Sequence, residues 1–293
     1  MTKPERADLY TAVTNRIIAA LESGPERWVK FWQSSADTWR PVNHGSDRTY
    51  RGINLLLLAG VCHERGLAHN RWLTFNQARE LGGMVRKGSK GVPVVFWKPL
   101  ASAGQKDAEP ANDERESQRR VGVLARQFFV FNVADCDGLP ESVHDVPRDE
   151  SLASRIVHRS GARIIPGEPC YRADEDVVQL PQVSAFGSEP EMFAVAFHEL
   201  SHWCAPRVGR EQNAKRFGDD AYAVEELIAE LGSAMLCGAC GFTPVSRAAS
   251  YLDHWIRVLR QDSRAIFTVA SAAQTAADYL LERADQAEAA AVA

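Results

Sequence analysis

Long apolar runs, a signal-peptide core and a dense set of cysteines are all missing from this chain of 293 residues. No apolar stretch approaches the roughly 20 residues that a helix needs to cross a bilayer. The opening Met-Thr-Lys-Pro-Glu-Arg lacks the apolar core of a signal peptide. Six cysteines scattered over this length do not form the dense disulfide framework of a small secreted domain. We therefore expect a cytoplasmic protein with reduced thiols and no membrane partner.

The chain also lacks a Walker phosphate loop and the dense negative charge of a DNA mimic. The glycines at 82–83 and 88–91 do not have the spacing of a Walker phosphate loop, which argues against an NTP-binding loop. The net charge of −4 is small for a protein that imitates DNA with dense surface carboxylates, which argues against a DNA-mimic inhibitor.

The charges that are present divide unevenly along the chain. Residues 1–100 hold 15 Lys and Arg against 8 Asp and Glu, whereas the other 193 residues hold 19 against 30. A basic N-terminal part joined to an acidic C-terminal part predicts two functions in one chain, the first of them in contact with a polyanion.

Apolar periodicity predicts an α+β chain of two domains, a mixed α/β domain followed by a mostly helical domain with a small sheet. Helices are expected at 4–21, 53–61, 74–81, 151–160, 189–205 and 220–240, with one or two more over 248–284. Strands are expected at 92–97, 127–133 and 176–180. Prolines and charges gather around 139–149, so the predicted domains are residues 1–143 and 144–293. The polar segment at about 101–120 is interpreted as a flexible excursion, because the strands on either side are expected to pair.

The segment His198-Glu-Leu-Ser-His202 has a spacing with a chemical meaning. On a helix, residues four apart lie one turn apart on the same face, so both imidazoles can bind one ion. Glu199 would face the remaining coordination position and act as the general base. The capping-box pattern Ser188-Glu-Pro-Glu191 precedes the motif, and Pro206 and Gly209 follow it, so a helix is expected across it.

A second acidic helix supplies candidates for the third metal ligand. Glu226 and Glu230 are four residues apart and share a helix face. The pair resembles the gluzincin arrangement, which implies that Glu226 binds the metal and that Glu230 accepts the N–H of His198 or His202. Glu225 points about 100° away on the same helix and stays open as an alternative ligand. Solvated helix charges are the third possibility.

Two other features bear on peptide chemistry. Tyr171 and Tyr222 are alternative donors of a hydrogen bond to a tetrahedral oxyanion. The predicted strand Asp176–Leu180 precedes the metal helix, and we expect an extended peptide to pair with it as an edge strand.

Aromatic and cationic residues alternate through the basic part of the chain. Single-stranded nucleic acid binds to such mixtures, with bases stacked on rings and phosphates held by cations. The alternative, that these aromatics form the core of the domain, stays open. The candidate DNA-binding residues are Trp28, Lys30, Trp32, Arg40, Tyr50, Arg51, Asn54, Trp72, Phe75, Arg86, Lys87 and Lys90.

Several segments together resemble the ArdC-type plasmid antirestriction proteins, over nearly the whole chain. In the N-terminal part they are Tyr50-Arg-Gly-Ile-Asn54, Trp72-Leu-Thr-Phe-Asn-Gln77, Leu81-Gly-Gly-Met-Val-Arg-Lys-Gly88 and Phe129-Val-Phe-Asn132. In the C-terminal part they are Phe197-His-Glu-Leu-Ser-His-Trp203 and Tyr222-Ala-Val-Glu-Glu-Leu-Ile-Ala-Glu230. The resemblance implies an N-terminal domain that binds single-stranded DNA and is shared with plasmid primases. It also implies a C-terminal zincin-like metallopeptidase domain.

The resemblance further implies a protein of a mobile element that protects incoming DNA from host restriction during conjugation. Zn²⁺ is the expected metal, although imidazole and carboxylate ligands also accept Mn²⁺, Co²⁺ or Ni²⁺. Two alternatives remain for the mechanism. One is a DNA-binding module with a structural metal and no turnover, and the other is a DNA-activated protease that cleaves DNA-bound proteins.

Overall fold

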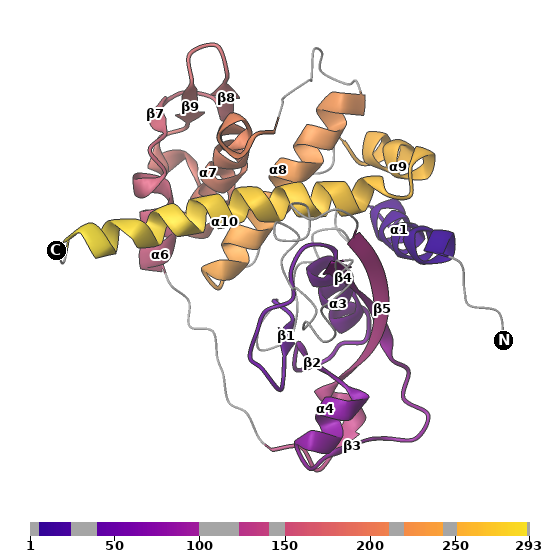
Figure 1. Cartoon of the computed structure of the whole chain (residues 1–293). Coiled ribbons are helices and arrows are strands. Elements are labelled where there is room, and N and C mark those ends of the chain that lie inside the picture. The colour runs from indigo at the N-terminus through magenta and orange to yellow at the C-terminus, as the bar shows by residue number, and fades with distance from the viewer. Residues whose placement is uncertain are drawn as a thin grey trace. The chain divides into compact units, whose positions relative to one another are not determined.

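The computed structural model describes residues 6–24, 40–99, 123–140, 150–210, 220–242 and 251–291 (Figure 1). Its contacts divide the chain into a small unit, Ser34–Asp145, and a large unit formed by Met1–Gln33 with Val146–Ala293. The predicted α+β architecture with two domains is confirmed. The predicted border between residues 143 and 144 and the excursion at about 101–120 lie outside the described residues.

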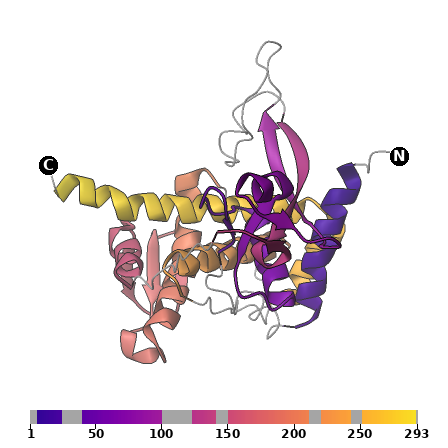
Figure 2. The same ribbon diagram turned by 90° about the horizontal axis from the view of Figure 1, so that it is seen from below.

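The small unit is built on a four-stranded sheet in the order β1-β2-β5-β4. Strand β4 pairs antiparallel with β5 along its whole length, and Figure 2 shows the two strands side by side. The sequence predicts this pairing. A separate two-stranded sheet joins β3 to β6. The elements of this unit are β1 (Val42–Asn43), α3 (Ile53–Glu64), β2 (Arg71–Thr74), α4 (Phe75–Glu80), β3 (Met84–Val85), β4 (Val92–Pro99), β5 (Val123–Asn132), η1 (Val133–Asp135) and β6 (Cys136–Asp137).

Helix α3 is apolar on every side because the unit buries it almost completely, from Ile53 to Cys62. Its residues Leu58 and Val61 pack with Trp72 and with alternate residues of β4 and β5. The side chain of Asn54 on α3 hydrogen-bonds to the backbone of β4. Its Nδ2 donates to the Val95 carbonyl at 2.6 Å, and its Oδ1 accepts from the Val95 amide at 2.7 Å.

The large unit is mostly helical, with one three-stranded sheet in the order β7-β9-β8. The sequence predicts β9, but not the short strands on either side of it. The elements are α1 (Arg6–Glu22), α6 (Glu150–Arg159), β7 (Arg163–Pro166), β8 (Cys170–Arg172), β9 (Val177–Leu180), η2 (Val183–Ala185), α7 (Glu189–Trp203), η3 (Ala205–Val208), α8 (Asp220–Ala239), α9 (Leu252–Gln261) and α10 (Ala265–Ala291). Within the described residues, no helix is both long enough and apolar enough to span a bilayer.

Helix α1 belongs with the large unit although it starts the chain. Thr14 Oγ1 donates to the Ser263 carbonyl at 2.6 Å, and the Tyr10 ring meets Phe267 edge-on with centroids 4.7 Å apart. Together with the contacts of α1 with α9, these interactions join the start of the chain to its C-terminal helices.

The centre of the large unit is the close packing of α7, α8 and α10. Gly232 allows α7 and α8 to approach, because a Cβ there would lie 2.5 Å from Ser201 Oγ. Ser233 Oγ also donates to the Ala194 carbonyl at 2.7 Å, which joins the two helices by a hydrogen bond. This contact fixes which face α8 turns toward α7.

Candidate metal centre

Helix α7 begins where the sequence predicts and carries the His-Glu-x-x-His motif. Ser188 Oγ accepts a hydrogen bond from the Glu191 amide at 3.3 Å, as an N-cap does. The Glu191 carboxylate reaches one residue further back than a capping box requires and accepts from the Gly187 amide at 2.9 Å. Gly209, with a positive φ of 70°, ends the η3 turn that follows α7.

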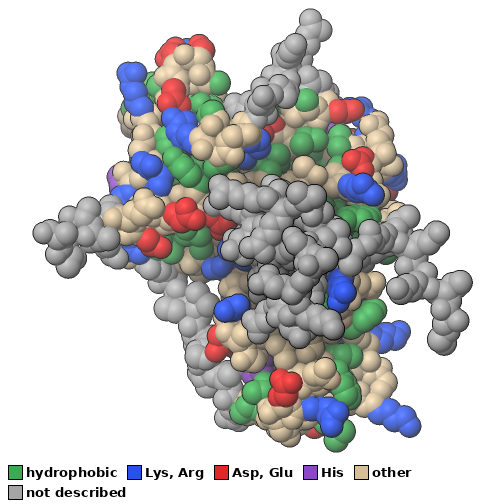
Figure 3. Space-filling view, viewed as in Figure 1, with side chains coloured by type: hydrophobic (Ala, Val, Ile, Leu, Met, Phe, Trp, Pro, Cys, Tyr) green, Lys and Arg blue, Asp and Glu red, His purple; other side chains and the backbone are tan. Residues whose placement is uncertain are grey.

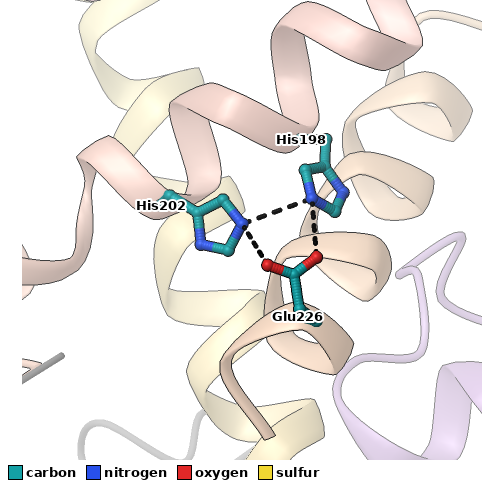
Figure 4. Close-up of side chains that lie close together, drawn as sticks. All are labelled: His198, His202 and Glu226. Atoms are coloured by element: carbon teal, nitrogen blue, oxygen red, sulfur yellow. Dashed lines mark hydrogen bonds and ion pairs between the residues drawn. The ribbon is translucent and has the colours of Figure 1, made fainter. Parts of the chain in front are cut away.

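Three side chains from α7 and α8 converge on one point (Figure 4). The Nε2 atoms of His198 and His202 lie 3.2 Å apart. Glu226 approaches from α8, with Oε2 at 3.5 Å from His198 Nε2 and Oε1 at 3.4 Å from His202 Nε2. Two nitrogen ligands and one carboxylate are thus brought to the corners of a small triangle.

The size of this triangle fits a zinc ion. Ligand atoms about 2.1 Å from zinc at tetrahedral angles are separated from one another by about 3.4 Å. The three separations here run from 3.2 to 3.5 Å. Three protein ligands would leave the fourth position for water or substrate, as in catalytic zinc sites. The residues present therefore suit a divalent ion.

Each histidine turns its second ring nitrogen toward another carboxylate of α8. His202 Nδ1 lies 3.0 Å from Glu225 Oε1, and His198 Nδ1 lies 3.8 Å from Glu230 Oε2. Glu230 thus lies on the outer side of a histidine, where the gluzincin resemblance expects it. Glu225, left open as an alternative ligand, lies on the outer side of His202 rather than at the point of convergence.

Burial and charge shift the protonation of these groups in opposite directions. Burial disfavours the His202 imidazolium, but hydrogen bonds and attraction from Glu225 and Glu226 outweigh it and raise the pKa of His202 to about 10. Burial likewise opposes ionisation of Glu226, but its interactions with His198 and His202 hold the pKa of this carboxyl well below its usual range. The centre therefore attracts cations, and a metal ion must displace the His202 proton.

The two tyrosines that the sequence suggests as oxyanion donors have different partners in the structure. Tyr171 Oη hydrogen-bonds to Asp176 Oδ1 at 3.1 Å. Tyr222 lies one turn before Glu226 on α8, and its ring lies 5.9 Å from that of Tyr251. Burial, the bond to Tyr251 and the Glu226 carboxylate raise the pKa of Tyr222, so it stays a protonated donor at neutral pH. Tyr222 therefore remains the candidate oxyanion donor beside the metal ligands, whereas the hydroxyl of Tyr171 is bonded to Asp176.

The strand expected to bind an extended peptide is not at an edge of the sheet. The expected strand, β9, is the central one, paired with β7 on one side and β8 on the other. The edge strand that contacts α7 is β8. Burial, and then the charge of Glu199, raise the pKa of its Cys170.

The structure gives three of the candidate DNA-binding residues a role inside the small unit. Trp72 is fully buried, and its Nε1 donates to Asn70 Oδ1 at 2.7 Å. Asn54 is occupied by the Val95 backbone. Tyr50 is 6% exposed and accepts a hydrogen bond from Asn43 Nδ2 at 3.1 Å. None of these side chains presents a ring face or polar group to a base, which corrects their assignment to a binding surface.

The remaining candidates differ in exposure. Phe75 is 47% exposed, and Lys87 and Lys90 are exposed. Arg86 is also exposed, but it is held by Asp137 at 3.0 Å and by the Ala134 carbonyl. Arg40 and Arg51 are half-buried, while Trp28, Lys30 and Trp32 lie outside the described residues.

An exposed aromatic residue of the small unit is absent from the sequence-based candidates. Phe129 on β5 is 54% exposed, whereas its neighbour Val130 is fully buried beneath α3. A Cβ on Gly91 would lie 3.0 Å from Phe129 Cβ and 3.2 Å from Phe131 Cζ, so a glycine there makes room for these rings. Strand alternation is the signal that could have identified Phe129, since it faces away from the buried side.

Both halves of the chain are similar to known proteins. Residues 7–131 match a family described as the N-terminal domain of anti-restriction factor ArdC, and residues 151–272 match one described as zincin-like metallopeptidase. A solved structure of the antirestriction ArdC protein from the R388 plasmid, in its Mn(II)-bound form, superposes with a TM-score of 0.76 at 36% identity. That alignment covers 95% of this chain and 98% of the other, as does the alignment with the metal-free structure of the same protein.

Two relatives show how the sequence recurs in other proteins. An uncharacterized protein, y4eC, of Sinorhizobium fredii (strain NBRC 101917 / NGR234) is 38% identical over 93% of this chain and 91% of its own length. A DNA primase TraC of Escherichia coli is 33% identical over 93% of this chain, but the match spans only 27% of the primase.

Proposed function

The chain belongs to the ArdC family of antirestriction proteins, and from this premise we propose that it couples a DNA-binding unit to a metal-dependent peptidase centre. The small unit would bind single-stranded DNA, and the large unit would hold a divalent ion. The protein would protect the DNA of a mobile element from host restriction during conjugative transfer. The observation that carries the catalytic part is the convergence of His198, His202 and Glu226 with a buried Glu199 next to a ligand.

His198, His202 and Glu226 are the proposed ligands, and Zn²⁺ is the proposed ion. Their nitrogen and oxygen donors also suit Mn²⁺, Co²⁺ or Ni²⁺, and the related R388 protein has a Mn(II)-bound structure. When bound, such an ion would supply Lewis-acid chemistry, which polarises a carbonyl and makes water more acidic.

Glu199 is the proposed general base. Its side chain is 5% exposed and follows His198 directly on α7, so it is held close to the ligands by the helix itself. A carboxylate in this position would take a proton from the attacking water and deliver it to the departing amine nitrogen. Tyr222 would donate a hydrogen bond to the carbonyl oxygen as negative charge develops on it.

An extended peptide would bind along β8. This strand pairs with β9 on one side only, and its backbone groups on the other side are available to a peptide within the described part of the chain. Backbone hydrogen bonds give such strand addition its affinity. The contact of β8 with α7, the helix that carries Glu199, would place the scissile bond near the general base.

The DNA-binding surface of the small unit would centre on Phe129 and Phe75. Both rings are about half exposed. Phe75 directly follows Thr74, and Phe129 directly precedes Val130, the cross-strand partner of Thr74. Lys87 and Lys90 precede Gly91, which lies against the Phe129 ring. In Figure 3 the lower part of the molecule presents hydrophobic side chains beside Lys and Arg. Bases would stack on the rings while the lysines contact phosphates.

The substitution Glu199→Gln tests whether proteolysis is the mechanism. It leaves every proposed metal ligand in place but removes the general base. We expect conjugative transfer into a restricting recipient to fall to the level seen without the protein, with metal content and DNA affinity unchanged. Transfer into a non-restricting recipient is the control, and Glu189→Gln is the matched variant at the start of the same helix.

Full protection by the Glu199→Gln variant would contradict the catalytic proposal. It would favour instead a DNA-binding module with a structural metal. Cleavage that needs added single-stranded DNA would support the second alternative, a protease directed at DNA-bound proteins.

A further inference from the structure

The guanidinium group of Arg210 is linked to the proposed metal centre through the Glu225 carboxylate. Arg210 Nε donates to Glu225 Oε2 at 3.1 Å, and Arg210 Nη2 donates to Glu225 Oε1 at 2.9 Å. The same carboxylate faces His202 Nδ1 at 3.0 Å. The side chains of Arg210 and Glu225 are only 12% and 11% exposed. Arg210, Glu225 and His202 thus form a chain of buried contacts that ends at a proposed ligand.

From this chain of contacts we infer that Arg210 and Glu225 are positioning residues that set the orientation of His202 and thereby the metal affinity. The inference rests on the proposed metal site. An outer carboxylate fixes the ring plane of a ligand histidine and directs the lone pair of its other nitrogen at the ion. A bidentate arginine then fixes the carboxylate, since two parallel hydrogen bonds leave it little freedom to rotate.

The backbone around Arg210 supports a positioning role. The Arg210 amide donates to the Ala205 carbonyl at 2.8 Å, and the preceding Gly209 has the positive φ that reverses the chain. Arg210 Nη2 also donates to the Ser201 carbonyl at 2.8 Å, one residue before His202. The guanidinium is therefore attached to α7 and α8 at once, and it links the backbone next to one ligand to the residue next to another.

The charge of the site gives Arg210 a second effect. Four carboxylates, those of Glu199, Glu225, Glu226 and Glu230, are each 5 to 8% exposed in this region. A divalent ion would balance only part of that negative charge, and a buried charge without a partner is strongly destabilising. Arg210 supplies a positive charge on the side of the site away from the proposed ion, so Glu225 can remain an ionised hydrogen-bond acceptor.

The corresponding contact at the other histidine is longer. His198 Nδ1 is 3.8 Å from Glu230, beyond hydrogen-bonding distance, whereas His202 and Glu225 are at 3.0 Å. We therefore expect Glu225→Ala to weaken metal binding more than Glu230→Ala does.

The test is a Zn²⁺ competition titration of the full chain against a chromophoric chelator. Removing an outer partner of a ligand histidine weakens metal binding by about 10- to 100-fold, and we expect this loss for Glu225→Ala. Arg210→Met should weaken binding by about tenfold, and Arg210→Lys by less, because lysine keeps the charge but lacks the fork. Arg257→Met is the matched control, since Arg257 pairs with Asp220 of the same helix α8, at 2.6 Å on the surface. It should leave the affinity unchanged.

A double variant separates positioning from simple stabilisation. If Arg210 acts through Glu225, Arg210→Met with Glu225→Ala should bind Zn²⁺ no more weakly than Glu225→Ala alone. Additive losses, or unchanged affinity in Arg210→Met and Glu225→Ala, would overturn the inference. Wild-type protein that binds no Zn²⁺ would overturn the metal site itself, which distinguishes the two failures. Arg210→Lys supplies the comparison if Arg210→Met does not fold.

Discussion

His202 has partners at both ring nitrogens, and it carries the proton that metal binding must remove. Its Nε2 faces His198 and Glu226, and its Nδ1 faces Glu225. Despite burial, the carboxylates raise the pKa of His202 to about 10. In the metal-free protein the ring is therefore protonated at neutral pH, and the ion and the proton compete for it.

This competition predicts the pH dependence of metal binding. Below pH 10 each bound ion releases the His202 proton, so the apparent affinity should rise with pH. We expect a gain approaching tenfold per pH unit between about pH 6 and pH 8. Zn²⁺ competition titrations at several pH values check it, with correction for the chelator's own protonation. An affinity that stays constant or falls over this range would contradict the assignment of His202.

At the scale of elements, the site depends on how closely α7 and α8 pack. Gly232 faces Ser201, and a Cβ at position 232 would also lie 3.2 Å from Ser201 Cβ. Neither atom belongs to the flexible end of a long side chain, so the helices themselves must move apart to admit it. Such a movement would separate Glu226 from the two histidines.

The variant Gly232→Ala should accordingly lose stability by about 1–3 kcal/mol, the usual effect of overpacking a core. It should also weaken metal binding, although position 232 lies well along α8 from the ligand. Chemical denaturation and Zn²⁺ titration measure the two effects. Adding Ser201→Ala removes the hydroxyl and should restore part of both; unchanged stability in Gly232→Ala would show that the helices are not in close contact.

In the small unit, Asn54 joins α3 to β4. Its two hydrogen bonds to Val95 are buried, and Asn54→Ala would leave the Val95 amide and carbonyl without these partners. We expect a loss of about 2–4 kcal/mol in the free energy of unfolding. Urea denaturation followed by tryptophan fluorescence measures it. A variant that keeps its stability but loses DNA affinity would restore Asn54 to the binding surface.

Sequence reasoning succeeds where spacing along one element decides the outcome. The separation of His198 from His202 and the i, i+4 relation of Glu226 to Glu230 suffice to bring the correct faces together once helices form. It is less informative where the rotation of one helix against another decides which side chain reaches the ion. Glu225 precedes the proposed ligand Glu226 in the sequence, but it contacts the outer nitrogen of His202 instead. Arg210 gives no local signal, because a turn and two helices bring it to the site.

The small unit shows a second limit of sequence reasoning. Aromatic and cationic residues alternate there, but composition does not separate Trp72, which is buried, from Phe129, which is half exposed. The difference arises from which side of the sheet α3 covers. Likewise, β9 is apolar enough to be recognised, while β7 and β8 are too short and too mixed in composition for their pairing to be foreseen.

At the scale of the whole molecule, the proposal assigns DNA binding and metal chemistry to separate units. Binding of single-stranded DNA should weaken steeply as salt rises, because phosphate contacts release counterions. Phe129→Ala should weaken binding by about 1–3 kcal/mol, the usual contribution of one stacked base, with little change in the salt slope. Val183→Ala, an exposed apolar residue of the large unit at 65%, is the control. Fluorescence anisotropy over a salt series tests both.

The DNA result should also be independent of the metal. Lys87→Ala with Lys90→Ala should lower the salt slope, while Glu199→Gln should leave both slope and affinity unchanged. Equal affinity for duplex and single strands, or loss of DNA binding on removal of the metal, would contradict the division between the units.

The most direct test of the central claim is the metal content of the full chain after removal of metal and reloading with Zn²⁺, measured by mass spectrometry. The wild type should retain one ion per chain, and His198→Ala and Glu226→Ala should retain almost none. His254→Ala, a histidine on α9, should behave as the wild type. Wild-type protein without bound metal, or a His198→Ala variant that keeps its ion, would contradict the claim that these residues form a metal centre.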